Sequence, residues 1–381
     1  MIEYRIAAGR NAQPERFDLS FLLIVLLLCG LGMVTLFSAS MHYADRLFSD
    51  SMYFIKRQGV HLVFSLAAML LFASVNLDLI RKFLPHLIFG TLVLCVLPFI
   101  PGLGVTKNGA SRWFAVGPLT FQPSELVKMV VVLYLAHYFT RESDDENTVL
   151  PPVVPPAIVT SVFVSLIYIQ NDFSTSFFIM LVALTMFFMA NIGIIWFLRL
   201  CVVAVPLSVL MILTREYRLQ RVLSFIWPNQ DPLGAGYQVN AAVTALREAG
   251  IWGRGMGNGV RKISSIPEVQ SDFIFAVWAE EMGFIGVLLF FALIGFFAWR
   301  GYRICLNCTD RYRALAGFGS VSIIVYQTLI NSAVVARVFP ATGVPLPFFS
   351  AGGSSLLVTL CLCGIIINVS RCSHQRELSH V

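Results

Sequence analysis

The stretch Leu19-Ser-Phe-Leu-Leu-Ile-Val-Leu-Leu-Leu-Cys-Gly-Leu-Gly-Met-Val-Thr-Leu-Phe37 contains no charged residue. A helix of about 20 apolar residues is long enough to cross the hydrocarbon core of a bilayer. The pattern recurs along the 381-residue chain, of which 57% is hydrophobic and only 13% charged, whereas soluble domains are roughly 25% charged. This composition excludes a soluble globular enzyme, a disordered protein and a disulfide scaffold. It predicts an all-α polytopic membrane protein.

Runs of low charge predict about ten transmembrane helices in a single membrane domain that spans residues 1–381. The expected spans are 19–37, 60–75, 84–100, 126–139, 153–169, 174–190, 194–213, 282–299, 315–335 and 350–367. The connection between the seventh and eighth helices, residues 214–281, is long. Connections of this length are uncommon unless they are functional.

The distribution of basic residues predicts the orientation of these helices, because short cytoplasmic segments of membrane proteins are enriched in Lys and Arg. With a cytoplasmic N-terminus, the short inner segments hold 13 basic residues and the short outer loops hold 6. The tails 1–17 and 368–381 are therefore expected in the cytoplasm, and the loop 214–281 outside. The net charge of +6 is explained by this asymmetry and gives no indication of nucleic-acid binding.

The first polar cluster on the predicted outer side runs from Asn108-Gly-Ala-Ser-Arg-Trp-Phe114 to Phe121-Gln-Pro-Ser-Glu-Leu-Val-Lys128. Pro123 is typical of a first helical turn, and Glu125 and Lys128 have the i,i+3 spacing of an ion pair. Charged residues at membrane depth should face the bundle and pair. This pair is expected either to lock the helix in place or to contact a substrate. Arg112 and Trp113 fit either a functional role or anchoring at the membrane interface.

The second cluster is the glycine-rich outer loop, which ends in Ile266-Pro-Glu-Val-Gln-Ser-Asp-Phe-Ile-Phe275. Asp272 stands where this loop meets an apolar run. Desolvation there should raise the pKa of its carboxyl group toward that of a useful general base. The alternative is that Ser271 or Asp272 caps the helix that follows.

The third cluster is Phe339-Pro-Ala-Thr-Gly-Val-Pro-Leu-Pro-Phe-Phe-Ser-Ala-Gly-Gly-Ser-Ser355, which Arg337 precedes. Its prolines and glycines exclude one continuous helix. A non-helical segment at membrane depth must be buried against protein or water, so a re-entrant segment is one interpretation. An ordinary outer loop with Ser350 as a helix cap is the other.

Together these clusters resemble the SEDS family, the polytopic proteins typified by FtsW and RodA. The resemblance rests on four motifs in the family's order: Asn-Gly-Ala-Ser-Arg-Trp (108–113), Phe-Gln-Pro-Ser-Glu-Leu-Val-Lys (121–128), Pro-Glu-x-x-Ser-Asp-Phe-Ile-Phe (267–275) and Pro-Leu-Pro-Phe-Phe-Ser-x-Gly-Gly-Ser-Ser (345–355). The family fold is a ten-helix bundle with a large extracytoplasmic loop before the eighth helix. Gly236-Tyr-Gln and Gly255-Met-Gly-Asn look more like the division-type branch, FtsW, than the elongation-type branch, RodA.

The resemblance implies a peptidoglycan glycosyltransferase of the bacterial inner membrane that polymerises lipid II during septal cell-wall synthesis. Its implied partners are a class B penicillin-binding protein acting as transpeptidase and other membrane proteins of the division complex. A lipid II flippase, an elongation-type polymerase and an idle scaffold are the alternatives. Because the polar motifs gather on one side of the predicted bundle, chemistry at the outer face is favoured over transport.

The resemblance also assigns roles to residues. Asp272 matches the family's essential aspartate, and it is expected to act as the general base on the acceptor hydroxyl. Trp113, Glu125 and Lys128 match positions tied to activity, as do Arg112 and Glu268. The cations expected to face the diphosphate of the undecaprenyl carrier are Arg112, Lys128, Arg261, Lys262 and Arg337. No Asp-x-Asp motif lies on the predicted outer side, so no metal site or cofactor is expected beyond a loosely bound Mg²⁺ at the diphosphate.

Overall fold

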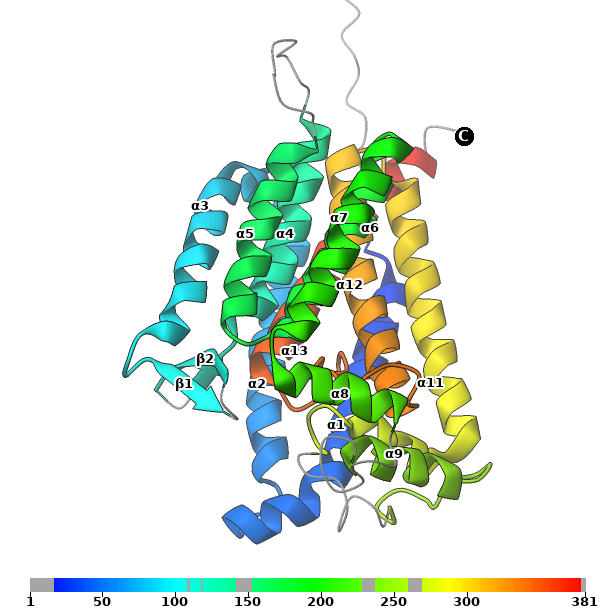
Figure 1. The fold of residues 1–381 in the computed structure, drawn as a ribbon. Coiled ribbons are helices and arrows are strands. Elements are labelled where there is room, and N and C mark those ends of the chain that lie inside the picture. The colour runs from blue at the N-terminus through cyan, green and yellow to red at the C-terminus, as the bar shows by residue number, and fades with distance from the viewer. Residues whose placement is uncertain are drawn as a thin grey trace, which may run out of the picture.

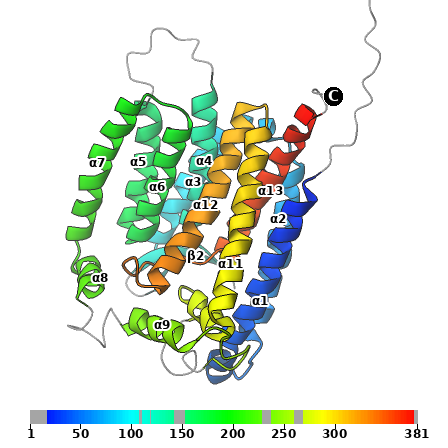
Figure 2. The ribbon, with the colours of Figure 1, turned by 90° about the vertical axis from the view of Figure 1, so that its right-hand side faces the viewer.

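The structure is a computed structural model that describes residues 17–107, 110–117, 119–141, 153–227, 237–259 and 269–377. Long helices run side by side to form a bundle, and a small sheet and two crosswise helices lie at one end of it (Figure 1). We call this the sheet end. The described N-terminal end of the first helix and the C-terminal end of the last helix lie together at the opposite end (Figures 1 and 2).

Each of the ten predicted spans falls on a helix of this bundle. The helices are α1 (Leu19–Phe48), α2 (Tyr53–Ser74), α3 (Leu77–Val96), α4 (Pro123–Thr140), α5 (Val154–Ile169), α6 (Phe173–Met189), α7 (Ile194–Leu213), α11 (Ile274–Asn307), α12 (Arg311–Val335) and α13 (Gly353–Glu377). Within the described residues, seven helices are long and apolar enough to cross a membrane, and α5 and α6 are shorter apolar helices. The all-α multi-pass fold is confirmed, whereas the number of ten crossings stays a prediction.

Polar residues between the apolar runs start several of these helices. Asp18 precedes α1 and accepts a hydrogen bond from Phe21 N at 2.9 Å, and Asp310 precedes α12 and accepts one from Arg313 N at 2.9 Å. Such caps satisfy backbone donors that have no partner within the helix. Pro123 occupies the first turn of α4, as the sequence predicts.

The connection predicted as a loop over residues 214–281 contains ordered helices. Helix α8 (Glu216–Ile226) lies across the sheet end below α7, and α9 (Tyr237–Glu248) packs near the start of α11 (Figures 1 and 2). The last eight residues of the predicted loop, 274–281, belong to α11. The sequence analysis did not identify these helices, because α8 and α9 are short and rich in polar residues and a search for apolar spans passes over them.

A small antiparallel sheet, also absent from the all-α prediction, joins α3 to α4. Its strands are β1 (Gly104–Lys107), β2 (Ala110–Val116) and β3 (Leu119–Phe121), in the order β1-β2-β3. β1 and β3 are too short to give a clear period-2 pattern, and the longer β2 does not alternate apolar and polar residues. The sheet carries Arg112 and Trp113, with Trp113 opposite Val105 of β1.

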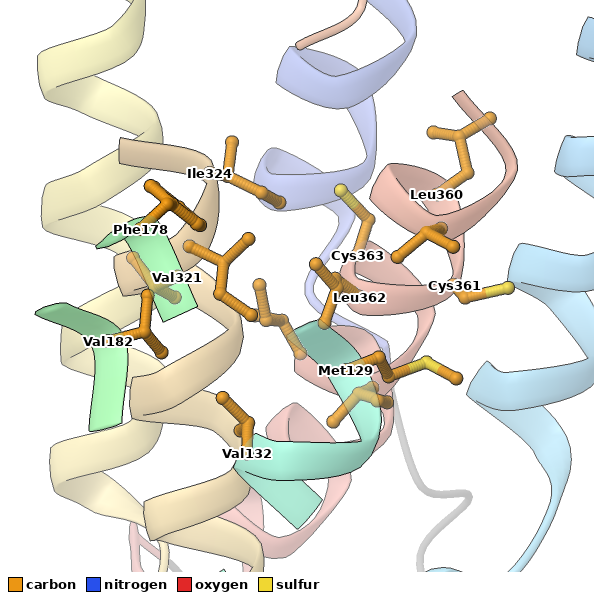
Figure 3. Close-up of a cluster of buried hydrophobic side chains, with 14 of the residues drawn as sticks. Met129, Val132, Phe178, Val182, Val321, Ile324, Leu360, Cys361, Leu362 and Cys363 are labelled. Carbon is orange, nitrogen blue, oxygen red and sulfur yellow. The ribbon is translucent and has the colours of Figure 1, made fainter. Parts of the chain in front are cut away.

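The centre of the bundle is formed by α12 and α13. Within their apolar windows 67% and 78% of residues are buried, whereas only 6% are buried in α7, so α7 lies at the edge of the bundle. Figure 3 shows the apolar cluster where α4, α6, α12 and α13 meet. Its side chains include Met129, Val132, Phe178, Val182, Val321, Ile324 and Leu362.

Candidate active site

The candidate site begins at a break near the start of α11. Gly283 has φ 66° and ψ −165°, so residues 274–282 form a buried helical segment that ends in a kink. A Cβ atom on Gly283 would lie 2.2 Å from Gly253 N, and one on Gly253 would lie 2.2 Å from Glu281 O. Two glycines far apart in sequence therefore permit a backbone contact that no other residue type allows. This contact fixes the segment that Asp272 precedes.

Asp272 is half-buried and lies directly before the start of α11. The cap position of α11 is Phe273, whose side chain makes no capping hydrogen bond. Ser271 and Asp272 therefore precede the cap position of α11, and the choice between a capping and a catalytic role for them stays a prediction. Asp272 O accepts a hydrogen bond from Asn331 Nδ2 at 2.8 Å, and Asp272 Oδ2 would lie 3.5 Å from a Cβ on Gly343. The carboxylate thus faces the non-helical segment between α12 and α13.

The later part of that segment is buried, as the re-entrant interpretation predicts, whereas Phe339 at its start is exposed. Leu346, Phe348 and Phe349 are each at most 4% exposed. Ser350 does not cap α13, which begins at Gly353; instead its Oγ donates to Ser271 O and accepts from Leu346 N. Ala351 N also donates to Gln270 O at 2.8 Å. These contacts favour the re-entrant interpretation over an ordinary loop capped by Ser350. These bonds hold the 270–272 backbone against the re-entrant segment.

The predicted ion pair of Glu125 and Lys128 is present in the first turns of α4. Their side chains are 2.7 Å apart and each is 3% exposed. Lys128 Nζ also donates to Gln327 Oε1 at 3.2 Å, and Gln327 Nε2 donates to Pro345 O at 3.3 Å. The pair is therefore connected through α12 to the segment that faces Asp272.

Arg112 extends from β2 toward the start of α6. Its Nη1 lies 3.7 Å from Asp172 Oδ1, and its Nη2 donates to Asn171 O. Asp172 is 2% exposed, caps α6 and accepts a further bond from Gln122 Nε2 at 3.0 Å. Trp113, the next residue of β2, is half-buried. The sheet is thereby joined to the starts of α4 and α6.

The remaining predicted residues divide into two groups. Arg261, Lys262 and Glu268 lie outside the described residues. Arg337 follows α12 with φ 56° and is half-buried, but it does not line the cavity at the sheet end that is described below. In the part of the chain that the structure describes, no group of three or more His, Cys, Asp or Glu residues is arranged to hold a metal ion.

The sequence interpretation missed several polar side chains that connect this site. Asn331 donates to both Asp272 O and Val344 O, and Gln327 stands one turn earlier on the same face of α12. Gln327 and Asn331 could have been predicted from the sequence, because two amide side chains at i,i+4 spacing within an apolar span are expected to face the interior of the bundle. Asp172 was also missed, because its importance arises only when β2 places Arg112 beside it.

The chain has close relatives in sequence. Residues 19–375 match the profile of the family described as cell cycle protein FtsW/RodA/SpoVE. A protein of Geobacter sp. (strain M18), named probable peptidoglycan glycosyltransferase FtsW, is 33% identical over 356 residues, which cover 93% of this chain and 97% of the relative. Stage V sporulation protein E of Bacillus subtilis (strain 168) is 36% identical over 357 residues, which cover 93% of this chain and 97% of that protein.

Two solved structures share the fold. One chain, solved in work on the structural coordination of polymerization and crosslinking by a peptidoglycan synthase complex, aligns with a TM-score of 0.78 and 28% identity over 94% of this chain and 99% of its own length. The rod shape determining protein RodA of Thermus thermophilus aligns with a TM-score of 0.69 and 26% identity over 93% and 97% of the two chains. The family profile and these alignments each cover more than nine-tenths of the chain. The chain therefore belongs to the FtsW/RodA/SpoVE family of polytopic membrane proteins.

Proposed function

We propose that this chain is a peptidoglycan glycosyltransferase that polymerises glycan strands from lipid II, in septal wall synthesis. The observation that carries the proposal is the placement of Asp272. Its backbone is fixed by Asn331 and its neighbour Ser271 by Ser350, while its carboxylate faces Gly343 of the re-entrant segment. The relatives named peptidoglycan glycosyltransferase support the same activity.

The reaction joins the 4-hydroxyl of an acceptor sugar to the anomeric carbon of a glycan chain carried on undecaprenyl diphosphate. A sugar hydroxyl is a poor nucleophile near neutral pH, so a carboxylate that takes its proton accelerates the attack. Asp272 is the proposed base. Attack from the face opposite the diphosphate inverts the anomeric centre and gives a β-1,4 link.

Negative charge develops on the departing diphosphate, and fixed cations stabilise it. Lys128 is not suited to this task, because Glu125 neutralises it at 2.7 Å and both side chains are buried. We assign this pair a positioning role, since its hydrogen bond to Gln327 leads to Pro345 of the re-entrant segment. Arg112, Trp113, Arg261, Lys262, Glu268 and Arg337 stay proposed contacts to the substrate.

The proposed setting is the bacterial inner membrane, with both termini in the cytoplasm and the sheet end outside. Lipid II would then meet Asp272 at the outer leaflet. A class B penicillin-binding protein is the proposed partner, which would crosslink the strands that this chain polymerises. The similarity to a chain studied within a peptidoglycan synthase complex supports this pairing.

The test is polymerisation of labelled lipid II by the purified protein in neutral-lipid nanodiscs, with and without its transpeptidase partner. The proposal predicts glycan chains that require the protein. A parallel assay follows movement of labelled lipid II across the bilayer of proteoliposomes. Transbilayer movement with no glycan chains under any condition would contradict the polymerase proposal and favour a flippase.

A further inference from the structure

A second feature of the sheet end is a cavity of about 140 Å³ beside the re-entrant segment. It is far larger than the roughly 10–15 Å³ that one water molecule needs. Its polar lining consists mainly of three arginines, Arg112 of β2 with Arg218 and Arg221 of α8, together with Asn171, Ser174 and Thr342. Helix α8 lies across the bundle here, so residues three apart on one of its faces both reach the cavity (Figure 1).

The cation of Arg218 is buried without a counter-charge among the described residues. Arg218 is only 8% exposed, and its Nη1 donates to Met211 O at 2.8 Å. Its guanidinium lies over the ring of Tyr168, at 4.4 Å from the centroid, and near that of Phe173 at 5.4 Å. These contacts orient the group by a carbonyl and two ring faces, and they leave its positive charge uncompensated.

Arg221 repeats this arrangement one turn later. It donates to Ala341 O at 3.2 Å and lies over the ring of Tyr217 at 4.5 Å. The third arginine, Arg112, is 3.7 Å from Asp172 and so has a partner. In the cavity wall, Thr342 Oγ1 is buried with no hydrogen-bond partner. The described lining therefore carries excess positive charge and an unused hydroxyl.

The two arginines without a counter-charge among the described residues favour an anion on the polar side of this cavity, whereas other lining residues such as Phe177 and Ile330 are apolar. A buried charge without a counter-charge is costly unless something neutralises it. Guanidinium groups bind phosphate oxygens through paired N–H donors, which makes phosphate the anion that several converging arginines favour. The shared chemistry of the expected ligand is thus a phosphate or diphosphate group.

Two further observations indicate a lipid-linked diphosphate. An apolar groove of about 650 Å³ runs between α5 and α7, and Ile169 is part of its lining. Ile169 follows Tyr168, whose ring lies under the guanidinium group of Arg218, so the groove ends near the cavity. A polyprenyl chain needs such a groove, and a free phosphate does not. On the other side, Thr342 and Val344 of the cavity flank Gly343, which the carboxylate of Asp272 faces.

We propose that Arg218 and Arg221 bind the diphosphate of the polyprenyl-linked substrate in this cavity, an inference that rests on the proposed function. When the bond between the anomeric carbon and the diphosphate oxygen breaks, the electron pair stays on that oxygen. The two guanidinium groups stabilise the charge, while the proton of the attacking hydroxyl passes to Asp272. Arg218 and Arg221 are thus substrate-binding residues, and neither was identified from the sequence.

The test measures binding separately from turnover. Purified protein in nanodiscs of neutral lipid is titrated with undecaprenyl diphosphate, with inorganic pyrophosphate and with phosphatidylglycerol. Arg221→Gln removes a positive charge, and Arg218→Lys keeps the charge but removes the paired N–H donors of the guanidinium group. Arg215→Gln is the matched control, because Arg215 is exposed and does not line the cavity. We expect both cavity variants to weaken undecaprenyl diphosphate binding at least about tenfold, and the control to bind as the unchanged protein does.

Each other outcome decides the proposal. Equal binding by Arg221→Gln and Arg215→Gln would overturn it, provided that Arg221→Gln unfolds at the normal temperature. Competition by phosphatidylglycerol as strong as by undecaprenyl diphosphate would also overturn it, because the site would then hold any anionic lipid. Asp272→Asn keeps these arginines, so it should bind undecaprenyl diphosphate normally. Arginine-dependent binding without polymerisation by the unchanged protein would count against the proposed function and leave the diphosphate site standing.

Discussion

Glu125 and Lys128 place two opposite charges where neither meets solvent. Each side chain is 3% exposed, and Gln327 is the further polar partner of Lys128. Removing one partner of a buried pair leaves an uncompensated charge, which costs about 3–5 kcal/mol, whereas removing both is often neutral. This asymmetry shows whether the two charges stabilise the protein as a pair.

Lys128→Met should therefore lower the free energy of unfolding by about 3–5 kcal/mol, and Glu125→Leu combined with Lys128→Met should recover most of it. The measurement is thermal or denaturant unfolding of the purified protein. Lys56→Met is the control, since Lys56 is 65% exposed in its pair with Asp50 and should change stability little. A double variant as unstable as Lys128→Met would show that the charges do not act as a pair.

At the residue scale, the sequence predicted those side chains that are unusual for their place in the chain. Glu125 and Lys128 were identified because charges rarely follow a helix start at membrane depth, and Asp272 because it stands at the edge of an apolar run. Arg218 and Arg221 look like ordinary surface residues of a basic loop. Their role depends on how α8 lies against the bundle, which no spacing along the chain reveals.

The helices of the sheet end depend on close backbone contacts. Gly253 and Gly283 have φ of 76° and 66°. A Cβ atom on Gly253 would overlap the backbone near Gly283, and a Cβ atom on Gly283 would overlap the backbone near Gly253. This contact sets the kink between residues 274–282 and the rest of α11.

Gly283→Ala should lower the free energy of unfolding by about 1–3 kcal/mol through backbone strain alone. The clash of the new Cβ atom with Gly253 N should lower it further. Gly295→Ala is the matched control in the same helix, because a Cβ there meets no atom within 4 Å. Alanine is the better helix former, so the control should be neutral or stabilised by up to about 1 kcal/mol. Unfolding temperatures of the two variants compare these effects, and equal stability would refute the close contact.

At the element scale, the sequence predicted the long helices well, because each is a run of apolar residues between polar caps. It missed α8, α9 and the sheet, whose residues are mixed in polarity and whose lengths are short. It left the segment between α12 and α13 open, because prolines and glycines exclude a helix without saying how deeply the chain is buried. Only packing against residues 270–272 settles that point.

The elements that carry the candidate active-site residues meet at the sheet end of the molecule. The start of α1 and the end of α13 lie at the opposite end (Figures 1 and 2). The excess of basic residues at the latter end predicts that it faces the cytoplasm. Reporter tags after Val381 and within residues 142–148 should therefore report cytoplasmic, and a tag near Gln230 should report the outer side. A cytoplasmic signal at Gln230 would place Asp272 on the wrong side for an outer-leaflet substrate.

The most direct test of the account replaces one proton-accepting group. Asp272→Asn keeps the size and hydrogen-bonding capacity of the side chain but cannot accept a proton at neutral pH, and the backbone bond from Asn331 is unaffected. Loss of acid-base assistance typically slows a reaction by about 100-fold or more. The variant and the unchanged protein are compared for chain formation from labelled lipid II and for capture of the transpeptidase partner. The account predicts normal insertion and capture with polymerisation lowered at least about 100-fold, and polymerisation at the normal rate would contradict it.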